Sequence, residues 1–281
     1  MGEAGKRGGF ETSDGVTLSY VEAGRGQPLV LIPGWSQTAE QFRHQVEGLA
    51  ERYHVFAFDM RGHGRSDKPE HGYRIARLAA DVHEALEGLG LDDVAILGHS
   101  MGCSVIWAYW ELFGPARLSK IILVDQMPYI VSNAEWSAEE TLLAGAIFSP
   151  EALHETCNAL RGPAGEETTR GFISNMVTSA MDAETLEWMI QCNFQMPRRH
   201  AATLLYHHGH QDWRDTIPRL ALPTLAVGGR ASLIPWQSVE WTAAQIAGAR
   251  LEIFEEDEGG NHFMFVENPE KFNRVVADFV G

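Results

Sequence analysis

The sequence predicts an α/β fold: a mainly parallel sheet of eight strands flanked by helices, with a helical cap inserted after the sixth strand. Short, uninterrupted apolar runs recur along the 281 residues, and such runs are typical of strands buried on both faces. Helix-length segments separate most of these runs. One long interval lacks them and is rich in helix-forming and aromatic residues.

The first two strands are expected as a hairpin over residues 10–23, because Asp14-Gly15 supplies the positive φ values of a tight turn. The apolar runs that predict the other six strands lie at residues 28–33, 53–58, 94–97, 121–124, 224–227 and 251–254. Since strands alternate with helices, these runs are expected to form the parallel part of the sheet.

The interval without a convincing buried strand gives the predicted cap, residues 128–213, on a core formed by residues 1–127 and 214–281. No Gly/Ser-rich linker separates the two, so the cap is expected to pack on the core. Ordinary helix packing is the alternative explanation for many of its large apolar residues. The residues considered for an apolar pocket are Trp35, Met127, Trp136, Phe148, Phe172, Met176, Trp188, Met189, Phe194, Met196 and Phe263.

Composition excludes several classes of partner. With 22 basic and 38 acidic residues the formal charge is −16, so the surface should repel nucleic acids and anionic membranes. Cys103, Cys157 and Cys192 are far apart and fit neither a disulfide framework nor a zinc site. Residues 1–7 lack the apolar core of a signal peptide and no later run reaches spanning length, which favours a cytoplasmic protein. Nothing in the sequence sets an oligomeric state.

The strongest chemical signal is Gly-His-Ser-Met-Gly at residues 98–102, directly after one predicted strand and before a helix-like segment. A sharp strand-to-helix turn strains the backbone at the serine, and flanking glycines remove side chains that would clash there. An isolated copy of this motif is usually only a turn. Its context here indicates that Ser100 is a nucleophile at the carboxyl edge of the sheet.

A serine hydroxyl needs a base, and His262 is the best placed of the 12 histidines. It lies in Gly-Gly-Asn-His-Phe, residues 259–263, after the last predicted strand and before a predicted helix start at residues 267–272. A loop at this point can bring the imidazole to the edge that carries Ser100.

Together with Arg-Gly-His-Gly-Arg-Ser at residues 61–66, which we interpret as a structural turn, these features resemble the α/β-hydrolase superfamily. The resemblance covers essentially the whole chain outside the cap. It implies that the turn at residues 33–35, Pro-Gly-Trp, supplies an oxyanion-binding N–H from Trp35, and that Met101 supplies the second. The Trp35 side chain is also expected to wall the pocket.

The acid of the expected triad departs from the commoner family pattern. Many relatives carry it after the penultimate strand, in a segment that resembles residues 228–235, but the corresponding position here is Ala231. Either that carboxylate was substituted or the acid comes from elsewhere. Asp125, at the end of the strand at residues 121–124, is the favoured candidate, as in haloalkane dehalogenases and cofactor-free ring-cleaving dioxygenases; capping of the strand end is the alternative. Weaker candidates are Glu255, Glu256 and Asp257.

The expected function is hydrolysis of a small-molecule carboxylic ester or lactone with a small to medium, largely apolar acyl group, through an acyl-enzyme on Ser100 and without a cofactor. Dehalogenases and epoxide hydrolases of this fold carry Asp at the Ser100 position. Similar serine proteins are often labelled non-haem chloroperoxidases, after a perhydrolysis side reaction. The alternatives are a cofactor-independent dioxygenase of a heteroaromatic ring and a non-catalytic ligand receptor.

A metal site is not expected. The histidine-rich stretch at residues 207–212 reads His-His-Gly-His-Gln-Asp, but adjacent histidines rarely point at one ion and no H-E-x-x-H spacing is present. These residues are expected to join the cap to the sheet, with one side chain facing the pocket.

Overall fold

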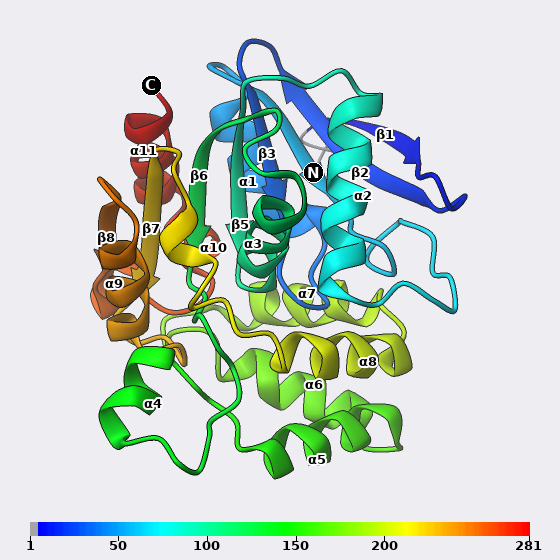
Figure 1. Ribbon diagram of the computed structural model, residues 1–281. Helices are drawn as coiled ribbons and strands as arrows, with labels where there is room; N and C mark the ends of the chain where they lie inside the picture. Colours follow the sequence, from blue (N-terminus) through cyan, green and yellow to red (C-terminus); the bar gives the residue numbers. More distant parts are fainter. Residues whose placement is uncertain (1–4) are drawn as a thin grey trace.

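The computed structural model describes residues 5–281 and contains one eight-stranded sheet in the order β1-β2-β4-β3-β5-β6-β7-β8 (Figure 1). Strands β1 and β2 pair antiparallel, as do β2 and β4, and all remaining pairs are parallel. The predicted fold class is therefore confirmed. The strands are β1 Lys6–Glu11, β2 Thr17–Gly24, β3 Pro28–Ile32, β4 His54–Phe58, β5 Val94–His99, β6 Leu118–Val124, β7 Thr224–Gly229 and β8 Arg250–Phe254. Residues 1–4, part of the segment considered for a signal peptide, lie outside the described residues.

Helices cover both faces of this sheet. On one face lie α2 (Ile75–Gly88), α3 (Met101–Phe113) and α9 (Trp236–Gln245), and on the other lie α1 (Arg43–Leu49) and α11 (Pro269–Val280). Short elements connect them: η1 (Ala39–Phe42), η2 (Ile217–Arg219), η3 (Glu256–Glu258) and α10 (Met264–Glu267). Within residues 5–281 no helix is long and apolar enough to cross a membrane.

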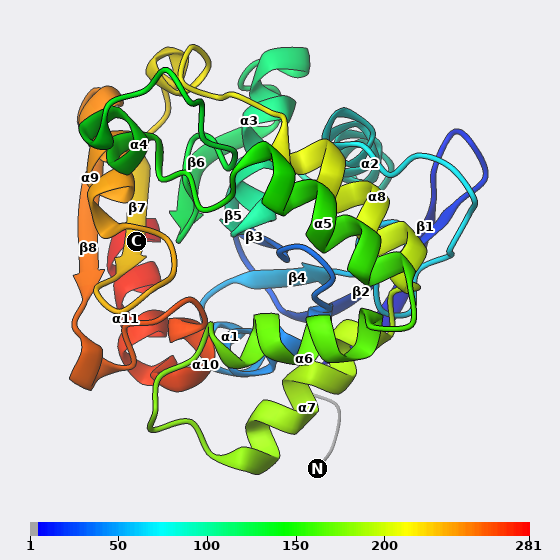
Figure 2. The same cartoon turned by 90° about the horizontal axis from the view of Figure 1, so that it is seen from below.

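Five helices lie between β6 and β7 in the sequence and sit beyond the carboxyl ends of the parallel strands, as Figure 2 shows from that side. They are α4 (Ala138–Ala144), α5 (Pro150–Arg161), α6 (Gly165–Ser174), α7 (Ala183–Phe194) and α8 (Arg198–Gly209). Local sequence explains several of their starts: Ser149 and Asp182 accept hydrogen bonds from the first turns of α5 and α7, and Pro150 occupies a first-turn position where no N–H is needed.

The β1–β2 hairpin at one edge of the sheet and β8 at the other are less buried than the central strands. The β1–β2 hairpin turns at Gly15, whose φ of 78° suits glycine, but β1 begins earlier than the predicted residue 10. Strand β8 was expected to be buried on both faces, and this is wrong. It is an edge strand, so Leu251 keeps 37% of its surface exposed.

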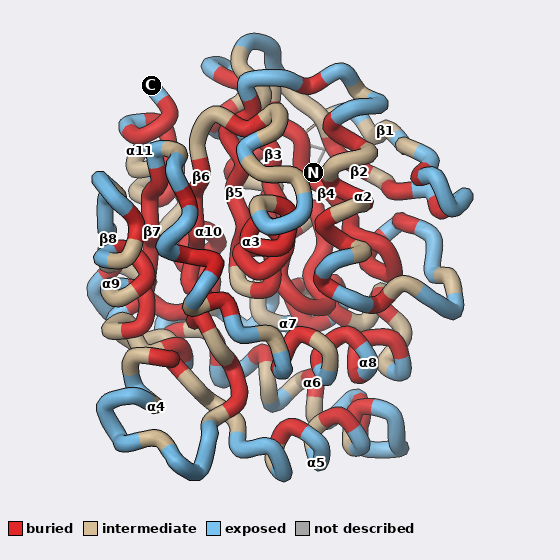
Figure 3. Tube along the Cα trace, viewed as in Figure 1, coloured by how far each residue is buried: buried red, intermediate tan, exposed pale blue. Residues whose placement is uncertain are grey.

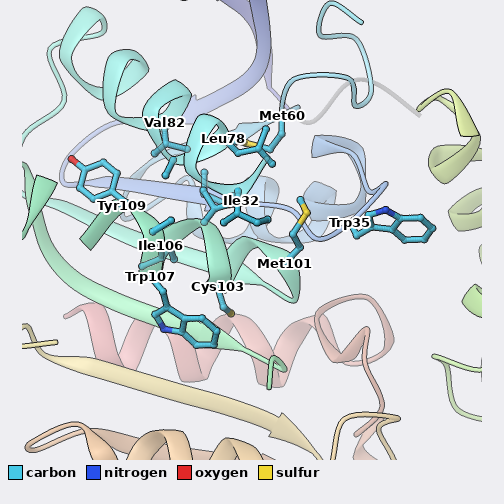
Figure 4. Packing of buried hydrophobic residues seen from close by; sticks show 14 of the residues in the cluster. Ile32, Trp35, Met60, Leu78, Val82, Met101, Cys103, Ile106, Trp107 and Tyr109 are labelled. Atoms are coloured by element: carbon cyan, nitrogen blue, oxygen red, sulfur yellow. The ribbon is translucent and has the colours of Figure 1, made fainter. Parts of the chain in front are cut away.

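The core consists of two apolar layers, one on each face of the sheet, because successive strand residues point to opposite faces. In β6, Ile121 and Leu123 join the layer under α2 and α3, while Ile122 and Val124 join the layer under α11. Figure 3 shows the buried trace running through every central strand, and Figure 4 shows the α3 side chains packed in the first layer. This packing fixes the point where β5 passes into α3.

A buried ion pair holds the turn at residues 61–66. The Arg61 guanidinium is fully buried and donates from Nε and Nη2 to the two carboxylate oxygens of Asp81 on α2, both at 2.8 Å. Its Nη2 also contacts Asp14 in the hairpin turn at 2.8 Å. One side chain thus joins the chain after β4, helix α2 and the hairpin.

Removing Asp81 should destabilise the fold strongly. In Asp81→Ala the Arg61 charge would stay buried without its main partner, and breaking a buried pair in this way costs about 3–5 kcal/mol. Urea unfolding measures this change. The control is Asp92→Ala, which removes the exposed pair with Arg117 and should cost less than about 1 kcal/mol. Equal small effects of both variants would show that Arg61 does not depend on this pair.

Candidate active site

The turn between β5 and α3 places Ser100 at the carboxyl edge of the sheet. Ser100 has φ 53° and ψ −124°, a strained conformation for a residue with a side chain, and its N–H donates to the Val124 carbonyl at 2.8 Å. Glycine is required on both sides. A Cβ on Gly98 would lie 2.5 Å from the Gly102 backbone, and one on Gly102 would lie 2.3 Å from the Ile32 carbonyl. The close approach of β3, β5 and α3 therefore forces the serine outward.

The structure brings Asp125 and His262 into direct contact. His262 Nδ1 lies 2.7 Å from Asp125 Oδ2, and both side chains are almost fully buried. Asp125 directly follows β6 and has φ 50°, which turns its carboxylate toward the loop after β8. Because a carboxylate only accepts hydrogen bonds, Nδ1 carries the hydrogen and Nε2 is left as the basic nitrogen.

Two further donors hold the Asp125 carboxylate, and both come from the end of β7. The Gly229 N–H donates to Oδ1 at 3.2 Å, and the Ser232 hydroxyl donates to Oδ2 at 2.5 Å. Ser232 directly follows Ala231, whose own N–H donates to the Gly260 carbonyl at 2.9 Å. The segment that resembles the usual acid-bearing loop thus contributes two donors to the Asp125 carboxylate and no carboxylate of its own. Glu255, Glu256 and Asp257 are exposed and are not the histidine's partners.

The turn at residues 33–35 lies directly beside Ser100. A Cβ on Gly34 would come within 2.9 Å of the Ser100 Cβ, so only glycine permits this approach. Ser36, the residue after this turn, donates its N–H to His63 Nε2 at 3.1 Å, and His63 Nδ1 donates to the Arg61 carbonyl. Burial lowers the pKa of His63 to about 4, which keeps the ring neutral and able to accept. The turn at residues 61–66 therefore positions the expected oxyanion-binding turn.

Met101 is the first residue of α3, so its N–H has no acceptor within the helix and lies at the positive end of the helix dipole. Its side chain is fully buried beside the β3 residue Ile32 (Figure 4). The Trp35 indole donates to the Ala201 carbonyl of α8 at 2.7 Å, and its ring meets Phe172 edge-on. Both residues are thus held rigidly next to Ser100.

His99 is a site residue that sequence reasoning missed. Its Nε2 donates to the His262 carbonyl at 2.8 Å, and its Nδ1 lies 2.8 Å from the side-chain amide of Gln37. Gln37 in turn accepts the Gly34 N–H at 2.9 Å. Residue 99 thereby links the histidine loop to the turn at residues 33–35. The one sequence signal that could have identified His99 is its position directly before Ser100 in the Gly-His-Ser-Met-Gly motif.

Ser100 and His262 line one small cavity of about 40 Å³, which residues of helices α6 and α8 also line. The Ser100 hydroxyl forms no hydrogen bond with His262 here, and such contacts commonly tighten only when substrate binds. Leu233 lines the cavity and is itself 40% exposed. The other lining residues are Trp35, Gln126, Met127, Ile130, Ile147, Phe148, Phe172, Met176, Leu205, His208 and Ile234.

Six of the eleven residues expected in the pocket do not line this cavity. Trp136 packs with Tyr129 under the Arg214 guanidinium, and Trp188 lies under Arg43. Phe194 contacts two arginines, Arg170 and Arg198. Phe263 is fully buried against His99 and Phe265. Cation–π contacts therefore hold three of these rings away from the cavity, and core packing holds the fourth. Met189 and Met196 are also core residues.

The histidine-rich stretch contributes a single lining side chain, His208. Across the part of the chain that the structure describes, no three His, Cys, Asp or Glu residues are grouped as a metal site would require. Cys103 is buried on α3 with its thiol donating to the Gly98 carbonyl at 3.0 Å, and burial raises the pKa of that thiol well above its ordinary value. It packs at the serine turn.

The sequence pattern of the family described as alpha/beta hydrolase fold matches residues 27–269. The chain belongs to this family. Non-heme chloroperoxidase CPO-A1 of Kitasatospora aureofaciens is 27% identical over 287 residues, covering 96% of this α/β hydrolase and 98% of that protein. The soluble epoxide hydrolase of Corynebacterium sp. (strain C12) is 27% identical over 271 residues, covering 92% of this α/β hydrolase and 91% of that protein.

Among solved structures, the esterase EaEST from Exiguobacterium antarcticum superposes with a TM-score of 0.88 at 25% identity, covering 97% of this α/β hydrolase and 98% of that chain. The relatives therefore support hydrolase activity. Their names cover different reactions, so they do not select a substrate.

A methyl group at Gly102 should disturb both the serine turn and the turn at residues 33–35. In Gly102→Ala the new Cβ would overlap the Ile32 carbonyl at 2.3 Å, and overpacking of this kind costs about 1–3 kcal/mol. The matched control is Gly171→Ala on α6, where a Cβ meets nothing within 4 Å and alanine should be neutral or stabilise by up to about 1 kcal/mol. Urea unfolding of both variants tests the difference; equal stabilities would contradict it.

Proposed function

We propose that this α/β hydrolase cleaves carboxylic esters or lactones with a small, largely apolar acyl group, through an acyl-enzyme on Ser100. The observation that carries the proposal is the 2.7 Å contact of His262 Nδ1 with Asp125 Oδ2, on a histidine that lines the same cavity as Ser100. A buried carboxylate on Nδ1 leaves Nε2 free to accept the serine proton.

In the proposed reaction, Ser100 Oγ attacks the substrate carbonyl carbon while its proton passes to His262 Nε2. Asp125 stabilises the resulting imidazolium and keeps its own negative charge. The tetrahedral intermediate then collapses, the carbon–oxygen bond to the alcohol breaks, and that oxygen takes the proton from Nε2. In a lactone the alcohol stays attached to the acyl chain. Water activated by His262 releases the acid in the second half-reaction.

The negative charge that develops on the carbonyl oxygen needs donors that are already in place. The Trp35 and Met101 N–H groups are proposed for this role, because the Gly34 turn abuts Ser100 and Met101 begins α3. Ten apolar side chains make up most of the cavity wall, and they favour an apolar acyl group and strengthen these electrostatic contacts by excluding water.

Variants of Ser100 and Asp125 test the roles proposed for these two residues. With a panel of chromogenic esters and lactones, Ser100→Ala should lower kcat by at least about 10⁴-fold, because the nucleophile is lost. Asp125→Asn should lower it by about 10⁴-fold, because the amide favours the wrong histidine tautomer. Full activity of Ser100→Ala would contradict the acyl-enzyme mechanism.

The Ala231 position provides a matched test of the acid. The Ala231 N–H donates to the Gly260 carbonyl in the loop that carries His262, and its neighbour Ser232 contacts Asp125. A carboxylate at residue 231 would therefore lie on the side of His262 that faces Asp125. The double variant Asp125→Asn with Ala231→Asp should recover at least about tenfold of the kcat lost in Asp125→Asn. No recovery, in a folded protein, would show that residue 231 cannot serve His262.

Cavity size predicts acyl-chain preference. A volume of about 40 Å³ matches roughly three water-sized positions, so acetate and butyrate esters should have kcat/KM at least about tenfold above octanoate. Phe148→Ala removes a ring from the wall and should shift the optimum to longer chains. An octanoate optimum in the unmodified protein would refute this size limit.

A second candidate is a cofactor-independent dioxygenase of a heteroaromatic ring. The observation that favours it is the combination of an acid at the end of β6 with a Pro-Gly-Trp turn at residues 33–35, which resembles those enzymes. Substrate-dependent oxygen uptake that survives in Ser100→Ala would identify it. A ligand receptor, the third possibility named above, would show tight binding with negligible turnover.

A further inference from the structure

The cavity wall contains two polar side chains that the proposed reaction does not use. Ten of its fourteen lining residues are apolar, and Ser100 and His262 carry the chemistry. The remaining two are Gln126, directly after Asp125, and His208 on α8. Burying polar groups in an apolar cavity is unfavourable unless their hydrogen bonds are made.

Gln126 is 5% exposed, and its orientation is fixed by its neighbour. Its Nε2 donates to the Met127 carbonyl at 3.0 Å. Because a carbonyl oxygen can only accept, the NH2 group must lie on that side of the amide. The amide oxygen, Oε1, then has no hydrogen-bond partner among residues 5–281.

His208 is 4% exposed and contacts two side chains through one nitrogen. Its Nε2 lies 3.0 Å from Ser104 Oγ and 3.5 Å from Gln126 Nε2. Since an amide NH2 can only donate, Nε2 is the acceptor and the ring hydrogen is on Nδ1. Burial lowers the pKa of His208 to about 3, so the ring is neutral at physiological pH. Within the described chain, Nδ1 has no partner.

We propose that Gln126 and His208 form a specificity pair that binds a hydroxyl or secondary amide carried by the substrate, with the substrate's hydrogen donated to Gln126 Oε1 and its oxygen accepting from His208 Nδ1. The inference rests on the proposed function, because it assigns the substrate of the same cavity. It narrows the esters and lactones to those whose acyl part bears such a group a few bonds from the carbonyl. A site with buried polar groups rejects analogues that leave them unpaired.

The test is binding, measured by calorimetry on Ser100→Ala, which does not depend on turnover. Methyl 3-hydroxybutyrate is compared with methyl 3-methylbutyrate, and methyl N-acetylglycinate with methyl levulinate, in which a CH2 replaces the N–H. The polar member of at least one pair should bind about tenfold more tightly, and the pair that discriminates tells hydroxyl from amide. Equal affinities within both pairs would overturn the proposal.

Adding Gln126→Met, a side chain of similar length without hydrogen-bonding groups, should abolish the preference while leaving the affinity for the apolar ester within about threefold. His208→Phe should weaken the preference as well. Retention of the full preference in folded Gln126→Met would overturn the assignment.

Ser104→Ala is the control for a purely structural role of His208, because Ser104 contacts His208 but does not line the cavity. We expect it to lower the melting temperature without removing the preference. If His208 only anchors α8, Ser104→Ala and His208→Phe will lower the melting temperature alike and neither will change the preference, which would overturn the role of His208. A failure of the proposed hydrolysis can be distinguished from a failure of this inference. In that case the unmodified protein shows no turnover, while the binding preference for the polar esters remains.

Discussion

The site depends on the close crossing of three backbone segments at Ser100. Strand β3 ends against the first turn of α3, β5 enters that turn, and the contacts at Gly98 and Gly102 leave no room for side chains. The serine is held in a conformation that a free chain would rarely adopt, so the surrounding sheet and helix must stabilise it. The same crossing sets the distance from Ser100 to the turn at residues 33–35. A displacement of any of the three segments would therefore affect Ser100 and the proposed oxyanion donors together.

A second constraint is that polar groups from distant parts of the chain meet at one buried edge of the sheet, the carboxyl edge of its parallel strands. Asp125 follows β6, its supporting donors Gly229 and Ser232 follow β7, and His262 follows β8. Neighbouring parallel strands end side by side, so a carboxylate can move from one strand end to the next and still reach the same imidazole. Ala231, at the position where many relatives carry the acid, has no carboxylate, and its neighbour Ser232 donates to Asp125.

The sequence was sufficient to predict the features that do not depend on the order of the strands. These are the class of sheet, the serine turn, and an acid and a histidine at the same edge of the sheet. Those follow from local motifs and from the rule that parallel strands share a carboxyl edge. It identified only half of the apolar cavity wall, five of ten residues: Trp35, Met127, Phe148, Phe172 and Met176. Helix periodicity does not tell which apolar face meets a cavity, and Trp188 and Phe194 lie beside arginines from other segments. Those contacts depend on tertiary packing, as do the bonds made by His99 and Ser232.

The distribution of charge explains why so acidic a protein can hold this site. No Asp, Glu, Lys or Arg is among the residues that line the cavity. Acidic residues such as Glu255, Glu256 and Asp257 are exposed to solvent and screened there. Inside the cavity the low dielectric strengthens each hydrogen bond and also makes each unpaired polar atom costly. The pairing requirement proposed for Gln126 and His208 and the charge stabilisation proposed at Ser100 would thus both depend on the same exclusion of water.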